Sequence, residues 1–128
     1  MIDKVIFDSS IWIDIRRGNQ KVIDATFQFI ESDSIVLVDI ICTEVLRGAK
    51  SDKDFATLSK IFSNFDILSV SWERVSTLAY KVSRKGFNPP LADLYIATCA
   101  IENKIGLVTK DKHFLSINAV DKFKLILV

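Results

Sequence analysis

The sequence predicts an α/β fold, a three-layer α/β/α sandwich with a central parallel β-sheet. Short runs of β-branched residues recur along the chain, and longer segments with helical spacing separate them. This alternation is typical of βαβ units, which build a parallel sheet. The chain has 128 residues, 49% of them hydrophobic, and only two prolines. We therefore expect one domain over residues 1–128 with a core of its own.

Five short apolar runs are predicted to be strands, at residues 4–7, 34–38, 66–70, 106–109 and 124–127. The segments with helical spacing predict helices at residues 11–17, 20–31, 40–49, 52–63, 71–84 and 90–103, and a short helix after Asp111. The strongest helix-breaking cluster, Gly-Phe-Asn-Pro-Pro at residues 86–90, is interpreted as a loop and not as a domain boundary.

The charge balance gives no global electrostatic sign of a nucleic-acid partner. The formal net charge is +1, because 17 Lys and Arg residues are offset by 16 Asp and Glu residues. Any binding of nucleic acid must therefore depend on local clusters of cations. No apolar stretch approaches the roughly 20 residues of a membrane span, and no targeting signal is recognisable. We expect a cytoplasmic protein without a membrane partner.

The cysteines and the histidine limit the possible metal chemistry. Cys42 and Cys99 lie far apart among apolar residues, which favours two reduced cysteines in the core. His113 is the only histidine, so the usual zinc sites and two-histidine chemistry are excluded.

Two acidic residues directly follow predicted strands. Asp8 comes after the apolar run at residues 5–7, and Asp111 lies just beyond the run at 106–109. In open parallel sheets the carboxyl ends of the strands form the edge at which ligands bind. Each residue could instead cap the helix that follows it, which Asp favours.

Two further acids lie in predicted helices. Glu44 lies near the start of its helix, at the border of the apolar arc, where a merely solvated side chain is the alternative. Asp93 lies in a helix that is apolar almost all round. A carboxylate in such surroundings must be paired, bound to a cation or protonated, because burying it alone costs several kcal/mol. A first-turn Asp favoured by the helix dipole is the alternative, but that effect is worth only about 0.3–1 kcal/mol.

Together, these positions predict a metal site. Asp8, Glu44, Asp93 and Asp111 each lie at the end of a strand or in the following helix, and in a parallel sheet such positions converge. Clustered carboxylates repel one another unless a cation neutralises them. Oxygen ligands without thiolate or imidazole partners select Mg²⁺ or Mn²⁺. A divalent ion at such a site suits the hydrolysis of phosphodiester bonds.

Nearby cations and hydroxyls fit a phosphate-containing substrate. The cations close to these acids in the sequence are Arg16, Arg17, Arg47, Lys50, Lys110 and Lys112. They could hold flanking phosphates, although each is also typical of a helix end or a solvated surface. Ser10 and Thr109 lie beside the proposed acids and could orient water or phosphate, while capping and strand-end roles explain them equally well.

Four segments together resemble the PIN-domain ribonucleases, specifically the VapC-type toxins of toxin–antitoxin systems. The segments are Val-Ile-Phe-Asp-Ser-Ser at residues 5–10, Thr-Glu-Val-Leu-Arg-Gly-Ala at 43–49, Leu-Ala-Asp-Leu-Tyr-Ile-Ala at 91–97 and Leu-Val-Thr-Lys-Asp-Lys-His-Phe at 107–114. No single segment is specific, but their order and the chain length make the resemblance strong, and it spans essentially the whole sequence.

The resemblance implies Mg²⁺- or Mn²⁺-dependent cleavage of structured RNA, of the transfer or ribosomal class. It also implies a homodimer and inhibition by a cognate VapB-like antitoxin. By position, the acids of the family correspond to Asp8, Glu44, Asp93 and Asp111. The family often carries a further acid just before the phenylalanine of the last segment, where this sequence has His113.

Two other functions remain open from the residues alone. A phosphotransfer domain with Asp8 as nucleophile would also suit an α/β fold, but its relatives carry a second acid two residues later, where this chain has Ser10. A catalytically inactive module that only binds a partner is the second alternative.

Overall fold

A computed structural model describes residues 3–128 of the chain. These residues form one five-stranded sheet with the order β3-β2-β1-β4-β5, in which every strand pairing is parallel. The strands are β1 (Val5–Phe7), β2 (Ile35–Val38), β3 (Ile67–Leu68), β4 (Gly106–Thr109) and β5 (Leu125–Leu127). The predicted central parallel sheet is confirmed.

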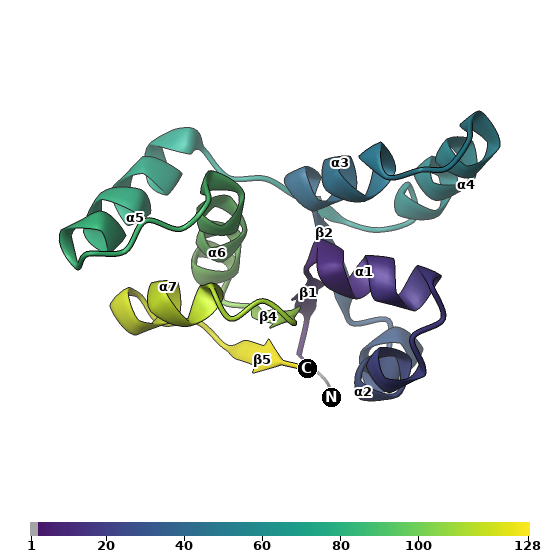
Figure 1. Cartoon of the computed structure of the whole chain (residues 1–128), viewed down its shortest axis with the longest axis horizontal. Helices are drawn as coiled ribbons and strands as arrows, with labels where there is room; N and C mark the ends of the chain where they lie inside the picture. Colours follow the sequence, from purple (N-terminus) through teal and green to yellow (C-terminus); the bar gives the residue numbers. More distant parts are fainter. Residues whose placement is uncertain (1–2) are drawn as a thin grey trace.

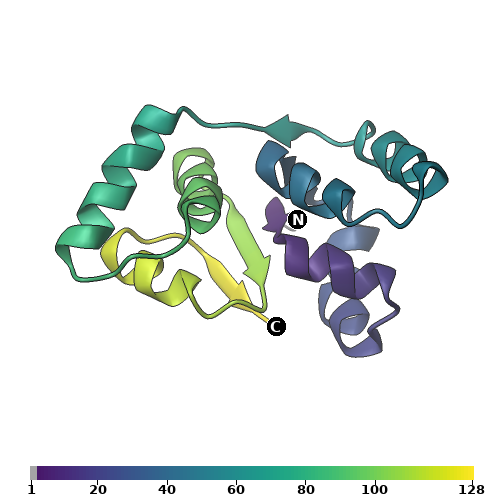
Figure 2. The ribbon, with the colours of Figure 1, turned by 45° about the horizontal axis from the view of Figure 1, so that its top comes forward.

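The helices follow the strands in the predicted order. They are α1 (Ser9–Arg16), α2 (Gln20–Glu31), α3 (Asp39–Arg47), α4 (Asp52–Phe62), α5 (Trp72–Arg84), α6 (Leu91–Asn103) and α7 (Phe114–Val120). In the views of Figures 1 and 2, α1 to α4 are grouped on one side of the molecule and α5, α6 and α7 on the other.

The two faces of the sheet carry separate apolar clusters, because successive side chains of a strand point to opposite faces. Val5 and Phe7 of β1 pack with Ile11 of α1 and with Val22 and Phe29 of α2. The other cluster is larger and joins the opposite face of the sheet to the remaining helices; from the sheet and from α3 and α6 it includes Ile6, Leu107, Ile41, Val45, Leu94 and Ile96. The three layers of the predicted sandwich are therefore present.

The direction of the strand order reverses between β1 and β4. From β1 the chain runs to β2 and β3 on one side, and then returns to β4 and β5 on the other. β1 and β4 are thus neighbours whose following helices leave in opposite directions. In open α/β sheets, ligands bind at the carboxyl ends of two such strands.

Many element boundaries differ from the sequence prediction by one or two residues, among them those of α1, β3 and α6. The first helix begins at Ser9 and not at residue 11, because Asp8 accepts a hydrogen bond from the Ser9 amide and caps it. The third strand is only two residues long, and its partner β2 ends at Val38, directly before α3 begins at Asp39. The sixth helix starts after Pro90, whose ψ of 147° is extended.

Cys42 and Cys99 are both buried and free, as predicted. Within residues 3–128, no helix combines the length and the apolar character that a membrane crossing requires.

Candidate metal centre

Asp8 lies at the carboxyl end of β1 and is the cap of α1. Only 6% of its surface is exposed. Its Oδ1 accepts the Ser9 amide at 2.8 Å, and its Oδ2 accepts the hydroxyls of Ser10 at 3.2 Å and Thr109 at 2.8 Å. Burial raises the pKa of Asp8, while these hydrogen bonds lower it and the charge of Asp111 raises it slightly further. Asp8 is therefore both a helix cap and a buried carboxylate at the carboxyl end of β1.

Thr109 connects the ends of β1 and β4. The parallel register pairs Phe7 with Val108, so that Asp8 and Thr109 follow at the same level of the sheet. The completely buried Thr109 hydroxyl donates to Asp8 and accepts the Asp111 amide at 3.0 Å. This hydroxyl holds the first and the last acid of the predicted set in a fixed relation.

Glu44 comes from α3 and is half-buried. Among residues 3–128, its buried Oε1 atom has no hydrogen-bond partner. Burial raises the pKa of Glu44, the nearby Asp8 charge raises it further, and Arg47 acts in the opposite direction. A buried acceptor without a partner is costly, unless a group such as a cation or a bound water satisfies it.

Asp93 lies in the first turn of α6, where the sequence predicted a buried charge, and the structure makes it half-buried. Its pKa is raised to about 6, mainly by burial and then by the charges of Asp111, Asp8 and Glu44, while His113 lowers it. The favourable helix dipole does not prevent this shift. The charges of all three other predicted acids therefore contribute to the raised pKa of Asp93.

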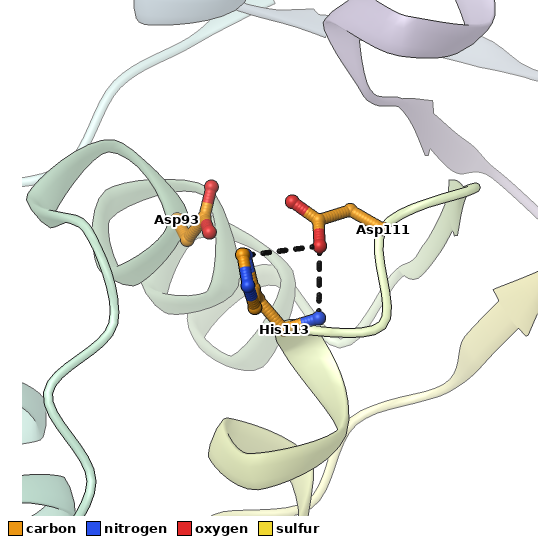
Figure 3. A group of neighbouring side chains, drawn as sticks. All are labelled: Asp93, Asp111 and His113. Atoms are coloured by element: carbon orange, nitrogen blue, oxygen red, sulfur yellow. Dashed lines mark hydrogen bonds and ion pairs between the residues drawn. The ribbon is translucent and has the colours of Figure 1, made fainter.

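Asp111 and His113 come from the loop between β4 and α7. The Oδ1 of Asp111 accepts the His113 amide at 2.8 Å and lies 3.1 Å from the imidazole Nδ1. One ligand atom each from Asp93, Asp111 and His113 lie within 4.8 Å of one another. Figure 3 shows these three side chains directed toward a common space.

The four predicted acids lie close enough for their charges to interact, and two of them, Asp93 and Asp111, form with His113 one group of possible metal ligands. Their mutual repulsion raises the pKa of Asp8, Glu44 and Asp93, although burial is the larger cause in each case. The donor set fits a hard divalent cation, because carboxylate oxygens dominate it and a buried Glu44 oxygen lacks a partner. Such an ion would relieve both the repulsion and the unsatisfied acceptor.

Two of the predicted phosphate-binding cations have acidic partners within the chain. Nη2 of Arg16 donates to both carboxylate oxygens of Asp54 in α4, at 2.8 and 2.7 Å. Lys110 pairs with Asp14 of α1. Sequence reasoning missed these partners, which offset the two charges that we expected to face a phosphate.

The remaining predicted cations lie near α1 and α3 or in the loop after β4. A pocket of about 160 Å³ between these helices is lined by Arg16, Arg17 and Lys50, together with Ile13, Val45 and Gly48. Arg47, at the end of α3, is exposed and attracts the Glu44 charge. Lys112 is exposed in the loop that carries Asp111. The Ser10 hydroxyl donates its hydrogen bond to Asp8.

His113 is the residue of the cluster that the sequence did not identify as a ligand. The available signal was its place two residues after Asp111, where the turn brings the imidazole back beside the carboxylate.

A family model described as "PIN domain" matches residues 5–120 of the chain. No curated protein sequence matches the chain. Among solved structures, the chain is similar to VapBC2 from Rickettsia felis bound to a DNA fragment from their promoter, with 20% identity and a TM-score of 0.77, covering 97% of this chain and 98% of that chain.

Two further structures are similar over most of their length. For FitAcB from Neisseria gonorrhoeae the identity is 17%, the TM-score 0.76 and the coverage 95% of this chain and 96% of that chain. For a toxin–antitoxin complex from Klebsiella pneumoniae the values are 24%, 0.68, and 87% and 90%. At these identities the likeness establishes the fold.

Proposed function

Because the chain belongs to the PIN-domain family, we propose that it is a metal-dependent endoribonuclease, a VapC-like toxin that a VapB-like antitoxin inhibits. The observation that carries this proposal is the proximity of Asp8, Glu44, Asp93 and Asp111 near the carboxyl ends of β1 and β4, where burial and the neighbouring acidic charges raise the pKa of Asp8, Glu44 and Asp93. Carboxylates crowded in this way are suited to hold a divalent cation.

The acids have distinct roles in this proposal. Asp8, Asp93 and Asp111 hold Mg²⁺ or Mn²⁺, and Glu44 either joins them or positions the attacking water. When bound, the cation polarises the phosphodiester and lowers the pKa of water. Thr109 and Ser10 keep the Asp8 carboxylate in place through their hydrogen bonds of 2.8 and 3.2 Å.

We place the RNA backbone along the surface of α1 and α3. The pocket lined by Arg16, Arg17 and Lys50 offers cations near the helix that carries Glu44. Cations that contact phosphates position a nucleic acid without reading its sequence. Structured RNA of the transfer or ribosomal class is the proposed substrate, and an RNA substrate would place the protein in the cytoplasm.

The antitoxin is supported by the similar structures, which include a toxin–antitoxin complex. An active toxin should arrest growth when it is expressed alone in a bacterial host. Asp93→Asn should abolish this arrest, whereas Glu31→Gln, which removes an exposed acidic charge at the end of α2, should preserve it. Normal growth with the wild-type protein, expressed in folded form, would contradict the toxin assignment.

We also propose a homodimer, because an aromatic and apolar surface remains uncovered. Trp72 and Leu91 are 55% and 63% exposed. Trp72 packs against Tyr95 with ring centroids 5.0 Å apart, and Leu91 is one turn before Tyr95 on the same helix face. Exposed aromatic residues of this kind are enriched in protein interfaces. Light scattering should give twice the monomer mass, and Trp72→Ser should reduce it; a monomer at high concentration would contradict this proposal.

Cleavage of purified RNA tests the enzymatic proposal. Wild-type protein with Mg²⁺ or Mn²⁺ should cut a mixture of transfer and ribosomal RNA at defined positions, which sequencing of the new RNA ends would identify. A chelator should stop the reaction, as should Asp8→Asn or Asp93→Asn with an unchanged circular dichroism spectrum. Glu31→Gln is the matched control. Full activity of either aspartate variant would reject the assignment.

The same preparation distinguishes the two alternatives. A phosphotransfer domain would gain the mass of one phosphoryl group on Asp8 after incubation with a small phosphoryl donor. An inactive interaction module would leave every RNA intact, even with metal bound. We expect neither outcome.

A further inference from the structure

His113 lies within the acidic cluster and brings a nitrogen donor to it. A nitrogen of this side chain and one oxygen each of Asp93 and Asp111 are within 4.8 Å of one another (Figure 3). Oxygen ligands bind divalent cations at about 2.0–2.6 Å, so two ligands on opposite sides of one ion are about 4–5 Å apart. The spacing of the three side chains is therefore compatible with a shared ion.

Local structure holds the imidazole in this place. The Oδ1 of Asp111 accepts the His113 backbone amide, and the same oxygen contacts the imidazole Nδ1 at 3.1 Å. These contacts turn the side chain back toward Asp111. The imidazole is nevertheless 71% exposed, which leaves it accessible to a hydrated ion from solution.

The neighbouring lysine does not neutralise the carboxylates of this group. Lys110, the neighbour of Asp111, is paired with Asp14 on α1. The orphaned Oε1 of Glu44 provides a separate sign that the cluster is incomplete without a further group.

We propose that His113 is a nitrogen ligand of the divalent cation held by Asp93 and Asp111, and that it gives the site a preference for Mn²⁺ over Mg²⁺. Mg²⁺ is bound through oxygen ligands and loses its water reluctantly, whereas Mn²⁺, a first-row transition metal, accepts an imidazole nitrogen beside carboxylate ligands more readily than Mg²⁺ does. This inference rests on the proposed function, because it assumes that the acidic cluster binds metal.

Spectroscopy and calorimetry on the metal-loaded chain test the proposal without any RNA. Electron spin-echo modulation of bound Mn²⁺ should contain the coupling of an imidazole nitrogen in the wild type. His113→Asn, which offers an oxygen of similar reach, should lose this coupling. The ratio of Mn²⁺ to Mg²⁺ affinity, from calorimetric titrations, should fall by about tenfold in this variant, the lower end of what supporting groups contribute at metal sites. Lys85→Ala, a change at the exposed end of α5, should alter neither result.

The outcomes distinguish a failure of the proposed role of His113 from a failure of the proposed metal site. Mn²⁺ that binds to the wild type without nitrogen coupling, and with a ratio that His113→Asn leaves unchanged, overturns the role of His113 alone. A wild-type protein that binds no Mn²⁺, or an Asp93→Asn variant that binds it equally well, overturns the metal site and with it the proposed function.

Discussion

The hydroxyl of Thr109 donates a 2.8 Å hydrogen bond to Oδ2 of Asp8, although the two residues are 101 positions apart in the sequence. The same hydroxyl accepts the amide of Asp111. One buried side chain therefore fixes the relative positions of two proposed metal ligands that follow neighbouring strands.

Thr109→Val should weaken both the fold and the activity. The change leaves the Asp111 amide without its acceptor and removes one of the donors to buried Asp8, which should cost about 1–3 kcal/mol in the free energy of unfolding. Loss of such a supporting group lowers metal affinity or activity by about 10- to 100-fold. Urea unfolding and RNA cleavage measure the two effects. Thr109→Ser keeps the hydroxyl and should recover most of each; equal damage from both variants would argue against the hydrogen bond.

Tyr95→Phe should destabilise the protein without a direct effect on the acidic cluster. The Tyr95 hydroxyl accepts the Val70 amide at 3.2 Å and donates to Asp39 at 3.0 Å. Its removal should lower the free energy of unfolding by about 1–3 kcal/mol, because the Val70 amide loses its acceptor. Well below the melting temperature, the Mn²⁺ affinity measured by calorimetry should stay at the wild-type value. A large fall in Mn²⁺ affinity would show that this network also supports the metal site.

Without metal, the protein should become less stable as the pH rises from 5 to 7.5. The pKa of Asp93 is raised from 3.8 to about 6 in the folded protein, so the folded state binds this proton more tightly than the unfolded chain. Its contribution is fully present below pH 3.8 and is lost as the pH rises through about 6. The pKa values of Asp8 and Glu44 shift in the same direction.

Asp93→Asn should reduce this pH dependence and stabilise the metal-free protein at pH 7.5. One pKa unit corresponds to about 1.4 kcal/mol, and partial solvent screening of Asp93 reduces the expected gain to about 1–2 kcal/mol. Chemical denaturation at several pH values, in the presence of a chelator, measures it. Glu31→Gln is the control for removal of a negative charge. A pH dependence that is identical in Asp93→Asn and wild type would contradict the assignment.

Divalent metal should stabilise the folded protein, because a preformed acidic cluster is absent from the unfolded chain. At a free concentration 100 times its dissociation constant, Mn²⁺ should raise the free energy of unfolding by about 2.7 kcal/mol. The effect should be smaller at pH 5, where protons compete for the carboxylates. Denaturation with and without Mn²⁺ measures it, and Asp8→Asn should remove most of it. Equal stabilisation of Asp8→Asn and wild type would indicate that the ion binds elsewhere.

The sequence was sufficient to predict that Asp93 and Asp111 lie close together and that the charges of Asp8 and Glu44 act on Asp93. Asp8 and Asp111 follow apolar strands, and Asp93 lies in a helix without a polar face, so strand order and burial alone bring them together. The exact start of α1 was missed because Asp8 acts as both cap and candidate ligand.

The partners of the surface cations could not be predicted in the same way. Arg16 and Asp54 are 38 residues apart, and Lys110 and Asp14 are 96 apart. The ion-pair partners of long exposed side chains depend on how whole helices pack against one another. The spacing of apolar residues in the sequence does not predict that packing. The position of the His113 imidazole depends in turn on the loop that follows β4.

Crystals of the protein soaked in Mn²⁺, with diffraction data collected at a wavelength where manganese scatters anomalously, test most directly that these carboxylates bind a cation. We expect an anomalous peak near the carboxyl ends of β1 and β4, within about 2.0–2.6 Å of carboxylate oxygens from Asp8, Asp93 or Asp111. The Asp93→Asn crystal should lose or weaken this peak. A fully loaded ion elsewhere on the protein, with none among these residues, would contradict the account.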